Sequence, residues 1–246
     1  MSTHPHHAPL LRRIAAEGVG AFFLFATVIG SGIMAENLSL GNDAVALLGN
    51  TIATGAMLFV LITMLGPISG AHMNPAVTWV AAVRRELGWG DASLYILAQL
   101  GFGILGAWAA HLMFDLPTLQ LSVRARTGLG QWAGETIATF GLILTIVGTV
   151  RHRPGWVPAS VALYITAAYW FTSSTSFANP AITVARSLTN SFAGIAPHDV
   201  PLFVVAQLIG AACGAGLAAF LFDDGGAGRP PVTASSASPP AADRAN

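Results

Sequence analysis

Two Asn-Pro-Ala triplets stand out in this chain, because each pairs a hydrogen-bonding amide side chain with a proline. Their members are Asn74, Pro75 and Ala76 in the first triplet and Asn179, Pro180 and Ala181 in the second. Asn is a favoured helix N-cap and Pro is favoured at the first helical position, so each triplet predicts the start of a helix. Each opens a stretch of about ten residues, which spans about 15 Å as a helix, or half a bilayer. We therefore expect two half-helices, each with a positive N-terminus and an amide side chain at its tip.

The elements that hold these half-helices are predicted to be membrane-spanning helices. The 246 residues are 54% hydrophobic and 9% charged, whereas soluble domains are about 25% charged. Six windows are long and apolar enough to cross a bilayer, where only helices or closed barrels satisfy the backbone. These windows are 14–34, 44–66, 92–114, 132–150, 157–174 and 200–222, and the charged residues inside them are Glu17 and Glu135. The composition therefore indicates an all-α membrane protein.

Charge and cysteine content exclude other classes. Eleven basic residues balance eleven acidic ones and every basic residue is Arg, so no cationic tract is available for nucleic acid. Cys213 is the sole cysteine, which excludes an internal disulfide and a thiolate metal cluster. His4, His6 and His7 could bind a metal, but a flexible leader over residues 1–11 is the favoured interpretation. Residues 223–246 are rich in Gly, Pro, Ala and Ser and are expected to form a disordered tail. We expect no cofactor, no metal and no enzymatic activity.

The chain contains an internal repeat. Residues 16–30 align with 134–148, and the Ala-Gln-Leu run at 98–100 matches the run at 206–208. The repeats cover about 12–115 and 131–222. Three spans in each half put the two copies in opposite orientations across the membrane. The arginines favour cytoplasmic termini, because eight fall on that side and three, Arg124, Arg126 and Arg186, fall outside.

An inverted repeat brings the two half-helices together near the membrane midplane. Asn74 and Asn179 would then lie around one hydrated point, and two positive helix ends would oppose the passage of cations. Unwound carbonyls before each Asn would accept hydrogen bonds from passing hydroxyls. The residues that carry these carbonyls are Gly70, Ala71, His72 and Met73 in the first half, and Thr175, Ser176, Phe177 and Ala178 in the second. This arrangement predicts a pore for small neutral molecules.

The segment 68–78 (ISGAHMNPAVT) resembles the first loop motif of the major intrinsic proteins, the family of aquaporins and aquaglyceroporins. The resemblance covers about residues 12–222. It implies a right-handed bundle of six spans and two half-helices, with one pore in each subunit of a homotetramer in the lipid bilayer. It also implies that Glu17 and Glu135 are the family's buried glutamates, which accept hydrogen bonds from the re-entrant loops.

The second motif departs from the family. Most members carry Arg directly after the second Asn-Pro-Ala, whereas this chain has Ile182. Counting from the two Asn residues places the selectivity filter on Thr54, Ala167, Ser176 and Ile182, with Ala167 open to a shift of about two residues because Thr166 and Tyr169 lie nearby. Such a filter would be wide, without Arg, and uncharged. The run 175–186 (TSFANPAITVAR) is similar to a bacterial branch associated with arsenic-resistance operons. That similarity implies an inner-membrane channel for glycerol, urea, water and arsenite-type metalloid hydroxides.

Two single residues and the function itself leave alternatives open. Arg186 lies one helical turn beyond Ile182, so its guanidinium either overhangs the outer pore mouth and partly replaces the lost charge, or pairs with Asp199 or solvent at the interface. His72 either gates the pore with pH or is a hydrogen-bonded wall residue. An uncoupled channel is favoured; the alternatives are a water or glycerol facilitator without a metalloid role, and a proton-coupled secondary transporter that uses Glu17 and Glu135.

Overall fold

The computed structural model describes residues 8–222. The three histidines of the predicted leader and the predicted tail at 223–246 lie outside the described residues. Leu10 and Leu11, which the sequence assigns to a flexible leader, instead form the start of the first helix, α1 (Leu10–Leu38). The hydrocarbon-length estimate omits them because it stops at charged residues, and Arg12 and Arg13 follow directly.

The described residues form two successive groups of helices with the same order of lengths. In the first half two long helices precede a short one and a long one follows; these are α1, α2 (Asp43–Ser69), α3 (Pro75–Val83) and α4 (Trp89–Met113). The second half repeats this order with α5 (Leu129–His152), α6 (Val157–Phe171), α7 (Pro180–Arg186) and α8 (Val200–Phe222). Short 3₁₀ turns at Pro154–Trp156 and Pro197–Asp199 precede α6 and α8. The prediction of an all-α membrane fold with two half-helices is confirmed.

Among residues 8–222, five helices are long and apolar enough to cross a membrane by these criteria alone, namely α1, α2, α4, α5 and α8 with its preceding turn. The remaining predicted span, 157–174, ends earlier, because α6 stops at Phe171 after 15 residues. Thr172 ends it: both its backbone N–H and its hydroxyl donate to the carbonyl of Ala168. The extended backbone at Thr172 then turns the chain toward the second Asn-Pro-Ala.

Close helix pairs build each half. Helix α1 packs along α4, and α5 packs along α8. At Gly106 a Cβ atom would lie 2.3 Å from the backbone oxygen of Phe22, and at Gly214 it would lie 2.6 Å from the backbone oxygen of Phe140. These two contacts occupy equivalent places in the repeat, so glycine is required in both halves for the helix backbones to approach this closely.

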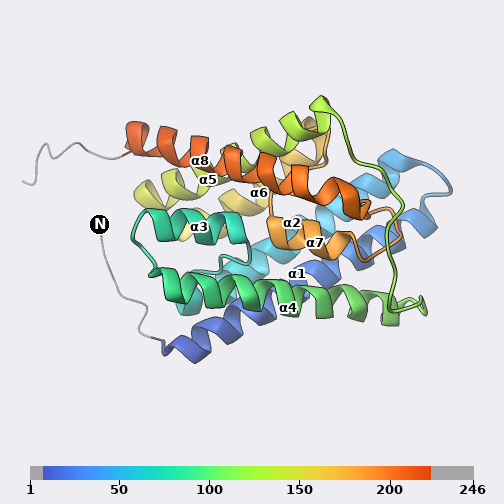
Figure 1. The fold of residues 1–246 in the computed structure, drawn as a ribbon, viewed down its shortest axis with the longest axis horizontal. Helices are drawn as coiled ribbons and strands as arrows, with labels where there is room; N and C mark the ends of the chain where they lie inside the picture. The colour runs from blue at the N-terminus through green and yellow to red at the C-terminus, as the bar shows by residue number, and fades with distance from the viewer. Residues whose placement is uncertain (1–7, 223–246) are drawn as a thin grey trace, which may run out of the picture.

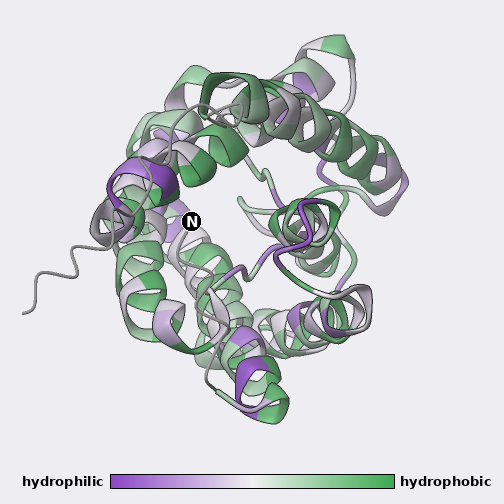
Figure 2. Cartoon of the chain, turned by 90° about the vertical axis from the view of Figure 1, so that its left-hand side faces the viewer, coloured by the Kyte–Doolittle hydropathy of each residue, from purple (hydrophilic) through white to green (hydrophobic). Residues whose placement is uncertain are grey.

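The two short helices lie between two of the long ones. Figure 1 shows α3 and α7 between α8 and α4, one beyond the other along the long axis of the bundle, and shows the start of α1 and the end of α8 at the same end of the molecule. Figure 2, viewed from that end, shows the long helices arranged in a ring whose outward surface is largely hydrophobic. Exposed apolar side chains on this surface include Phe59, Leu97, Leu163 and Ile209. The outward surface therefore suits a lipid or protein environment better than water.

Candidate pore and selectivity site

Both Asn-Pro-Ala triplets begin helices in the way that their sequence predicts. The side-chain oxygen of Asn74 accepts a hydrogen bond from the backbone N–H of Ala76 at 2.9 Å, and that of Asn179 accepts one from Ala181 at 2.9 Å. Both Asn residues have extended backbone dihedrals, and proline occupies the first turn of α3 and of α7. Each cap uses the amide oxygen, which leaves the amide nitrogen directed away from the helix.

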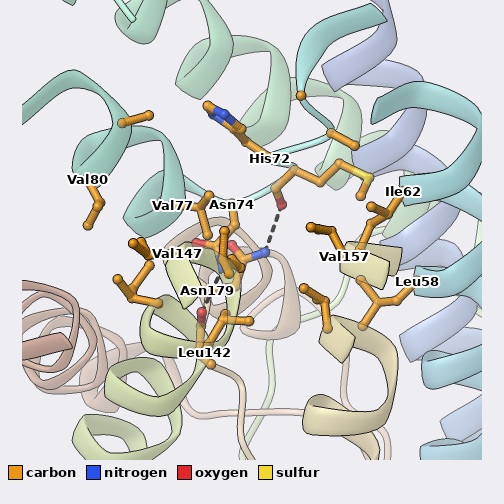
Figure 3. Close-up of a pocket in the computed structure, with 18 of the residues that line it drawn as sticks. Leu58, Ile62, His72, Asn74, Val77, Val80, Leu142, Val147, Val157 and Asn179 are labelled. Atoms are coloured by element: carbon orange, nitrogen blue, oxygen red, sulfur yellow. Dashed lines mark hydrogen bonds between the residues drawn. The ribbon is translucent and has the colours of Figure 1, made fainter. Parts of the chain in front are cut away.

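The two caps are joined by reciprocal hydrogen bonds across the repeat. Asn74 Nδ2 donates to the carbonyl of Ala178 at 2.8 Å, and Asn179 Nδ2 donates to the carbonyl of Met73 at 2.8 Å. Figure 3 shows both bonds in the close-up of the cavity. An amide nitrogen carries two hydrogens, so each Asn retains one donor for a molecule in the cavity. Each of the two carbonyls, which the sequence suggests as acceptors for a solute, already accepts one protein donor and keeps a single further lone pair.

Glu17 supports the first loop from α1. Its carboxylate is fully buried and accepts hydrogen bonds from the backbone N–H groups of His72 and Met73 at 2.9 and 2.6 Å. It also accepts from the hydroxyl of Ser69 at 2.7 Å and from Gln99 Nε2 at 2.8 Å. Four donors therefore converge on one carboxylate, which compensates for its burial.

Glu135 supports the second loop from α5 in the same way. It too is fully buried, and it accepts from the backbone N–H groups of Phe177 and Ala178 at 2.8 and 2.9 Å. Gln207 Nε2 donates to it at 2.6 Å and also to the hydroxyl of Thr183 at 2.8 Å. The first half has the matching bond from Gln99 to Thr78 at 3.0 Å. These contacts are the geometry that the family resemblance implies for both glutamates.

The loops held by these glutamates have strained backbones. Ala71 and Met73 have φ values of 50° and 48°, and Ser176 and Ala178 have values of 50° and 47°. This left-handed region costs a residue with a side chain about 1–2 kcal/mol. Left-handed residues at these places keep the loop backbones from continuing as helix, so their N–H groups can turn toward the carboxylates. The hydrogen bonds to Glu17 and Glu135 offset that strain.

A cavity of about 1590 Å³ passes both Asn residues. Its apolar wall comes from α2, α5 and α6, and Figure 3 labels Leu58, Ile62, Leu142, Val147 and Val157 around Asn74 and Asn179. At one end it reaches charged residues, which include Arg84, Glu86, Asp91 and Arg151. At the other it reaches Thr54, Tyr169 and Arg186. One face of the cavity is thus hydrocarbon, and the opposite face carries the loop backbones and the two amides.

Three of the four residues assigned to the filter line this cavity, namely Thr54, Ser176 and Ile182. The assignment of Ala167 is wrong, because this residue is exposed on the outside of α6. The residues of α6 that line the cavity recur every four positions, at Val157, Val161, Ile165 and Tyr169. Ala167 lies two residues from this stripe, which is more than half a helical turn away. Tyr169 lines the cavity instead, with its hydroxyl 3.3 Å from the hydroxyl of Thr54.

Seven of the eight residues expected to present carbonyls line the cavity. Thr175 does not: it is half-buried in the turn that follows α6, where its N–H donates to the carbonyl of Thr172. His72 lines the cavity, with Nδ1 3.2 Å from the hydroxyl of Thr78 and its ring against Tyr95. His72 therefore forms part of a hydrogen-bonded wall.

Arg186 is not an interfacial residue. It is 2% exposed, lines the cavity, and its Nε donates to the carbonyl of Ala193. The alternative that pairs it with Asp199 is wrong, because Asp199 instead accepts from the backbone N–H of Arg126 at 2.8 Å and lies 3.5 Å from His198 Nε2. Because Tyr169 and Arg186 also reach the cavity, its outer end is more polar than the sequence suggests.

Arg126 is the principal residue that sequence reasoning did not assign to the site. It lies in the connection between α4 and α5, is 8% exposed, and donates to three carbonyls, those of Ser174, Phe192 and Gly194. Burial lowers the pKa of Arg126 to about 10, with a further contribution from nearby Arg124. One feature of the sequence could have pointed to Arg126, because this residue lies in the longest connection between helices on the outer side. Within residues 8–222 no group of three metal-ligating side chains is present.

Comparison with known proteins agrees with this architecture. A family model described as Major intrinsic protein matches residues 4–173. The chain belongs to the major intrinsic protein family. It is 54% identical over 212 residues to the aquaglyceroporin AqpS of Rhizobium meliloti (strain 1021), which covers 86% of this chain and 91% of that protein. It is 31% identical over 224 residues to aquaporin NIP6-1 of Arabidopsis thaliana, which covers 87% and 70% of the two chains.

A solved structure shows the same fold. The aquaglyceroporin from Plasmodium falciparum superposes with a TM-score of 0.69 at 18% identity, covering 88% of this chain and 97% of that chain. Family membership and the apolar helices together make this chain a multi-pass integral membrane protein of the major intrinsic protein family. The family match ends at residue 173, before the second Asn-Pro-Ala.

Proposed function

We propose that this chain is a passive channel for water and small uncharged solutes, which include glycerol, urea and arsenite-type metalloid hydroxides. One observation carries the proposal. A single cavity passes both helix tips and the free donors of Asn74 and Asn179, with an apolar wall opposite. A solute with hydroxyl groups exchanges hydrogen bonds with water for bonds to these amides and the loop carbonyls, while its carbon or metalloid face meets hydrocarbon.

The charge distribution favours neutral solutes. The N-termini of α3 and α7 meet at the middle of the cavity, and each carries a partial positive charge that repels cations. Glu17 and Glu135 do not line the cavity and are already engaged by backbone and Gln donors. Their placement supports bracing over proton relay, and so supports a channel over a proton-coupled transporter.

The solute range rests on resemblance as well as on the site. Trihydroxy molecules such as glycerol and undissociated As(OH)₃ present hydroxyls of similar size and spacing. The 54% identity to a protein named aquaglyceroporin supports passage of solutes larger than water. The similarity of residues 175–186 to the arsenic-associated branch supports a metalloid role. A facilitator for water or glycerol without that role is the alternative.

Proteoliposomes that contain the purified full chain test the proposal. Stopped-flow light scattering is expected to show faster shrinking or swelling with water, glycerol and urea than empty vesicles show, and arsenite uptake is expected to rise in parallel. Each rate is measured with and without a pH gradient. Solute entry that requires the gradient would show that the protein is a coupled transporter and not a channel. Water and glycerol flux without arsenite uptake would instead support the facilitator without a metalloid role.

The assembly and location follow from the same resemblance. We infer a homotetramer in the bacterial inner membrane with both termini in the cytoplasm. The exposed apolar side chains of the long helices, which include Phe59 and Leu163, support contacts with lipid or neighbouring subunits. Native mass spectrometry from detergent tests the subunit number, and protease access to a tagged terminus in inside-out vesicles tests the orientation.

A further inference from the structure

Arg186 places a positive charge in the outer part of the cavity, although the position directly after the second Asn-Pro-Ala holds Ile182. It is the last residue of α7, one turn beyond Ile182, and its side chain leans back toward the helix start. Its guanidinium carbon lies 3.3 Å from the centre of the Phe177 ring. The ring therefore supports the guanidinium on one side, in the stacked geometry that Arg favours.

The donors of Arg186 are only partly used. Nε donates to the carbonyl of Ala193, which holds the following loop. The two Nη groups have no acceptor within residues 8–222. Because Arg186 lines the cavity, these groups are the ones that a molecule passing the outer end can reach. The structural bond and the free donors thus belong to different atoms of one side chain.

Arg126 differs from Arg186 in this respect. Its guanidinium lies 5.0 Å from the same Phe177 ring, but its three nitrogens all donate to backbone carbonyls and it does not line the cavity. Within the described part of the chain, neither guanidinium forms a salt bridge. Arg126 therefore braces the outer loops and contributes to the local positive field, whereas Arg186 presents its charge to the cavity.

A second polar group near Arg186 is unsatisfied. The hydroxyl of Ser176 is buried and has no hydrogen-bond partner among residues 8–222, although Ser176 lines the cavity and precedes Phe177. A buried hydroxyl without a partner costs free energy unless a ligand or water engages it. Across the cavity, the hydroxyls of Thr54 and Tyr169 lie close to each other. The outer end therefore offers the two free Nη groups of Arg186 and three hydroxyls around one passage.

We propose that Arg186 is the specificity-determining residue of this channel: it supplies, from one helical turn farther along, the charged outer wall that Ile182 does not provide. This inference rests on the proposed channel function. A guanidinium in a low-dielectric wall raises the barrier to cations, and its Nη donors together with Ser176 select neutral solutes that carry several oxygen atoms. The equivalent residue of the first half is Ala81, so the first half has no guanidinium at this place.

Four variants in proteoliposomes test this role. Arg186→Met removes the charge, Arg186→Lys retains the charge but not the guanidinium geometry, and Arg124→Met removes a nearby charge outside the cavity as the matched control. The fourth, Ile182→Arg combined with Arg186→Met, returns a guanidinium to the cavity from the adjacent turn. Cation leak is followed with an internal pH dye and with potassium efflux, and glycerol, urea and water permeabilities are measured per inserted channel.

We expect Arg186→Met to raise cation leak roughly tenfold, which corresponds to about 1.4 kcal/mol of barrier, and to lower the preference for glycerol over a monohydroxy alcohol of similar size. Arg186→Lys and the double variant are expected to restore low leak, and Arg124→Met is expected to match the unmodified chain. Should Arg186→Met fail to fold, Arg186→Gln, which keeps a donor for Ala193, takes its place.

The results separate this inference from the channel proposal. An unmodified chain that conducts no neutral solute would overturn the channel itself. A conducting chain in which folded Arg186→Met or Arg186→Gln shows unchanged leak and selectivity would overturn the role of Arg186 alone. Equal defects in Arg186→Lys and Arg186→Met would also overturn it. Such a result would mean that Arg186 acts by holding the carbonyl of Ala193 and not by its charge.

Discussion

The two halves of the molecule build the same loop but surround it with different side chains. In the first half Tyr95 donates its hydroxyl to the carbonyl of Ser69 at 3.1 Å. In the second half Phe203 stands at the equivalent place and has no hydroxyl, and Arg126 donates to the carbonyl of Ser174 instead. The equivalent carbonyl thus accepts a hydrogen bond from a helix of the same repeat in the first half. In the second half it accepts one from the connection between the two repeats.

The residues beside the two Asn caps diverge in a similar way. His72 in the first half corresponds to Phe177 in the second. His72 packs against Tyr95 and bonds Thr78, whereas Phe177 packs against Phe203 and carries a guanidinium on its face. The carboxylates, the glutamines and the caps are common to both halves. The shared residues therefore set the loop geometry, and the differing residues set the chemistry of each half of the cavity.

Loss of a bracing carboxylate should have the largest effect. Glu17→Ala and Glu135→Ala each leave several buried donors without an acceptor, at about 1–3 kcal/mol for each donor. We expect both to abolish flux and to lower the melting temperature in detergent, with the larger loss for Glu17, which accepts four bonds against three for Glu135. Asp43→Ala, at an exposed helix start, serves as the control. A larger loss for Glu135 would contradict the comparison.

Removal of the caps should affect the two halves equally. Asn74→Ala and Asn179→Ala each delete a cap bond of 2.9 Å and one bond to the opposite loop, and Asn179→Ala also deletes a longer cap bond of 3.3 Å from the N–H of Ile182. Each is therefore expected to cost about 1–3 kcal/mol and to reduce glycerol and water flux together. Asn37→Ala, at an exposed site near the end of α1, is the control. Thermal melting and stopped-flow rates measure both effects. Markedly unequal losses would show that the reciprocal bonds are not equivalent.

A new guanidinium should act differently in the two halves. Ile182→Arg is expected to lower glycerol, urea and arsenite flux about tenfold while water flux falls less, because pore size and charge at the outer end set selectivity. Val77→Arg, at the equivalent place of the first half, lies near His72 rather than a phenylalanine ring, and is expected to lower water and glycerol flux alike. Ile182→Leu controls for the change of side chain. Equal flux of large solutes in Ile182→Arg and the unmodified chain would count against the filter assignment.

The tyrosine hydroxyl of the first half should have a smaller effect. Tyr95→Phe removes one buried hydrogen bond to Ser69, so it is expected to lower the free energy of unfolding by about 1 kcal/mol and to lower flux modestly. Tyr164→Phe removes a comparable bond to Ala138, at 3.0 Å, away from the cavity. It should lower stability without changing flux. Reduced flux in Tyr164→Phe and unchanged flux in Tyr95→Phe would mean that the channel conducts without the hydrogen bond from Tyr95 to the carbonyl of Ser69.

The smallest effect concerns pH. Because burial holds the pKa of Arg126 at about 10, below the ordinary value for Arg, the folded state binds fewer protons than the unfolded state only above that pH. The contribution of Arg126 to stability is therefore constant between pH 6 and pH 8.5 or so and becomes more favourable as the pH rises through its folded pKa. We expect melting temperature and glycerol flux to show no step assignable to Arg126 in the neutral range. A step that disappears in Arg126→Met would contradict this.

Much of the fold and part of the site could be predicted from the sequence. The half-helices could be predicted because Asn and Pro mark a helix start by local chemistry. The membrane spans could be predicted because the length of an apolar stretch is a property of each segment alone. The bracing glutamates were accessible because a charge in an apolar window requires partners.

The remaining features depend on tertiary contacts. Ala167 and Tyr169 cannot be distinguished by counting along the chain, because the face that α6 turns to the cavity is set by its packing against α2 and α5. Arg126 reaches the second loop through a connection without regular structure, to which no periodicity applies. For Arg186 the sequence left two alternatives open. The ring of Phe177 holds its guanidinium inward, and the position of that ring is set only once both loops are folded.

The reciprocal Asn bonds also impose an order on biogenesis. Asn74 enters the membrane long before its acceptor, the carbonyl of Ala178, which is synthesised 104 residues later. Until the second half is inserted, the first half-helix therefore has an amide without its final partner, and the same holds for the carbonyl of Met73, which awaits Asn179. The nascent chain completes its centre last, when the two halves close on each other.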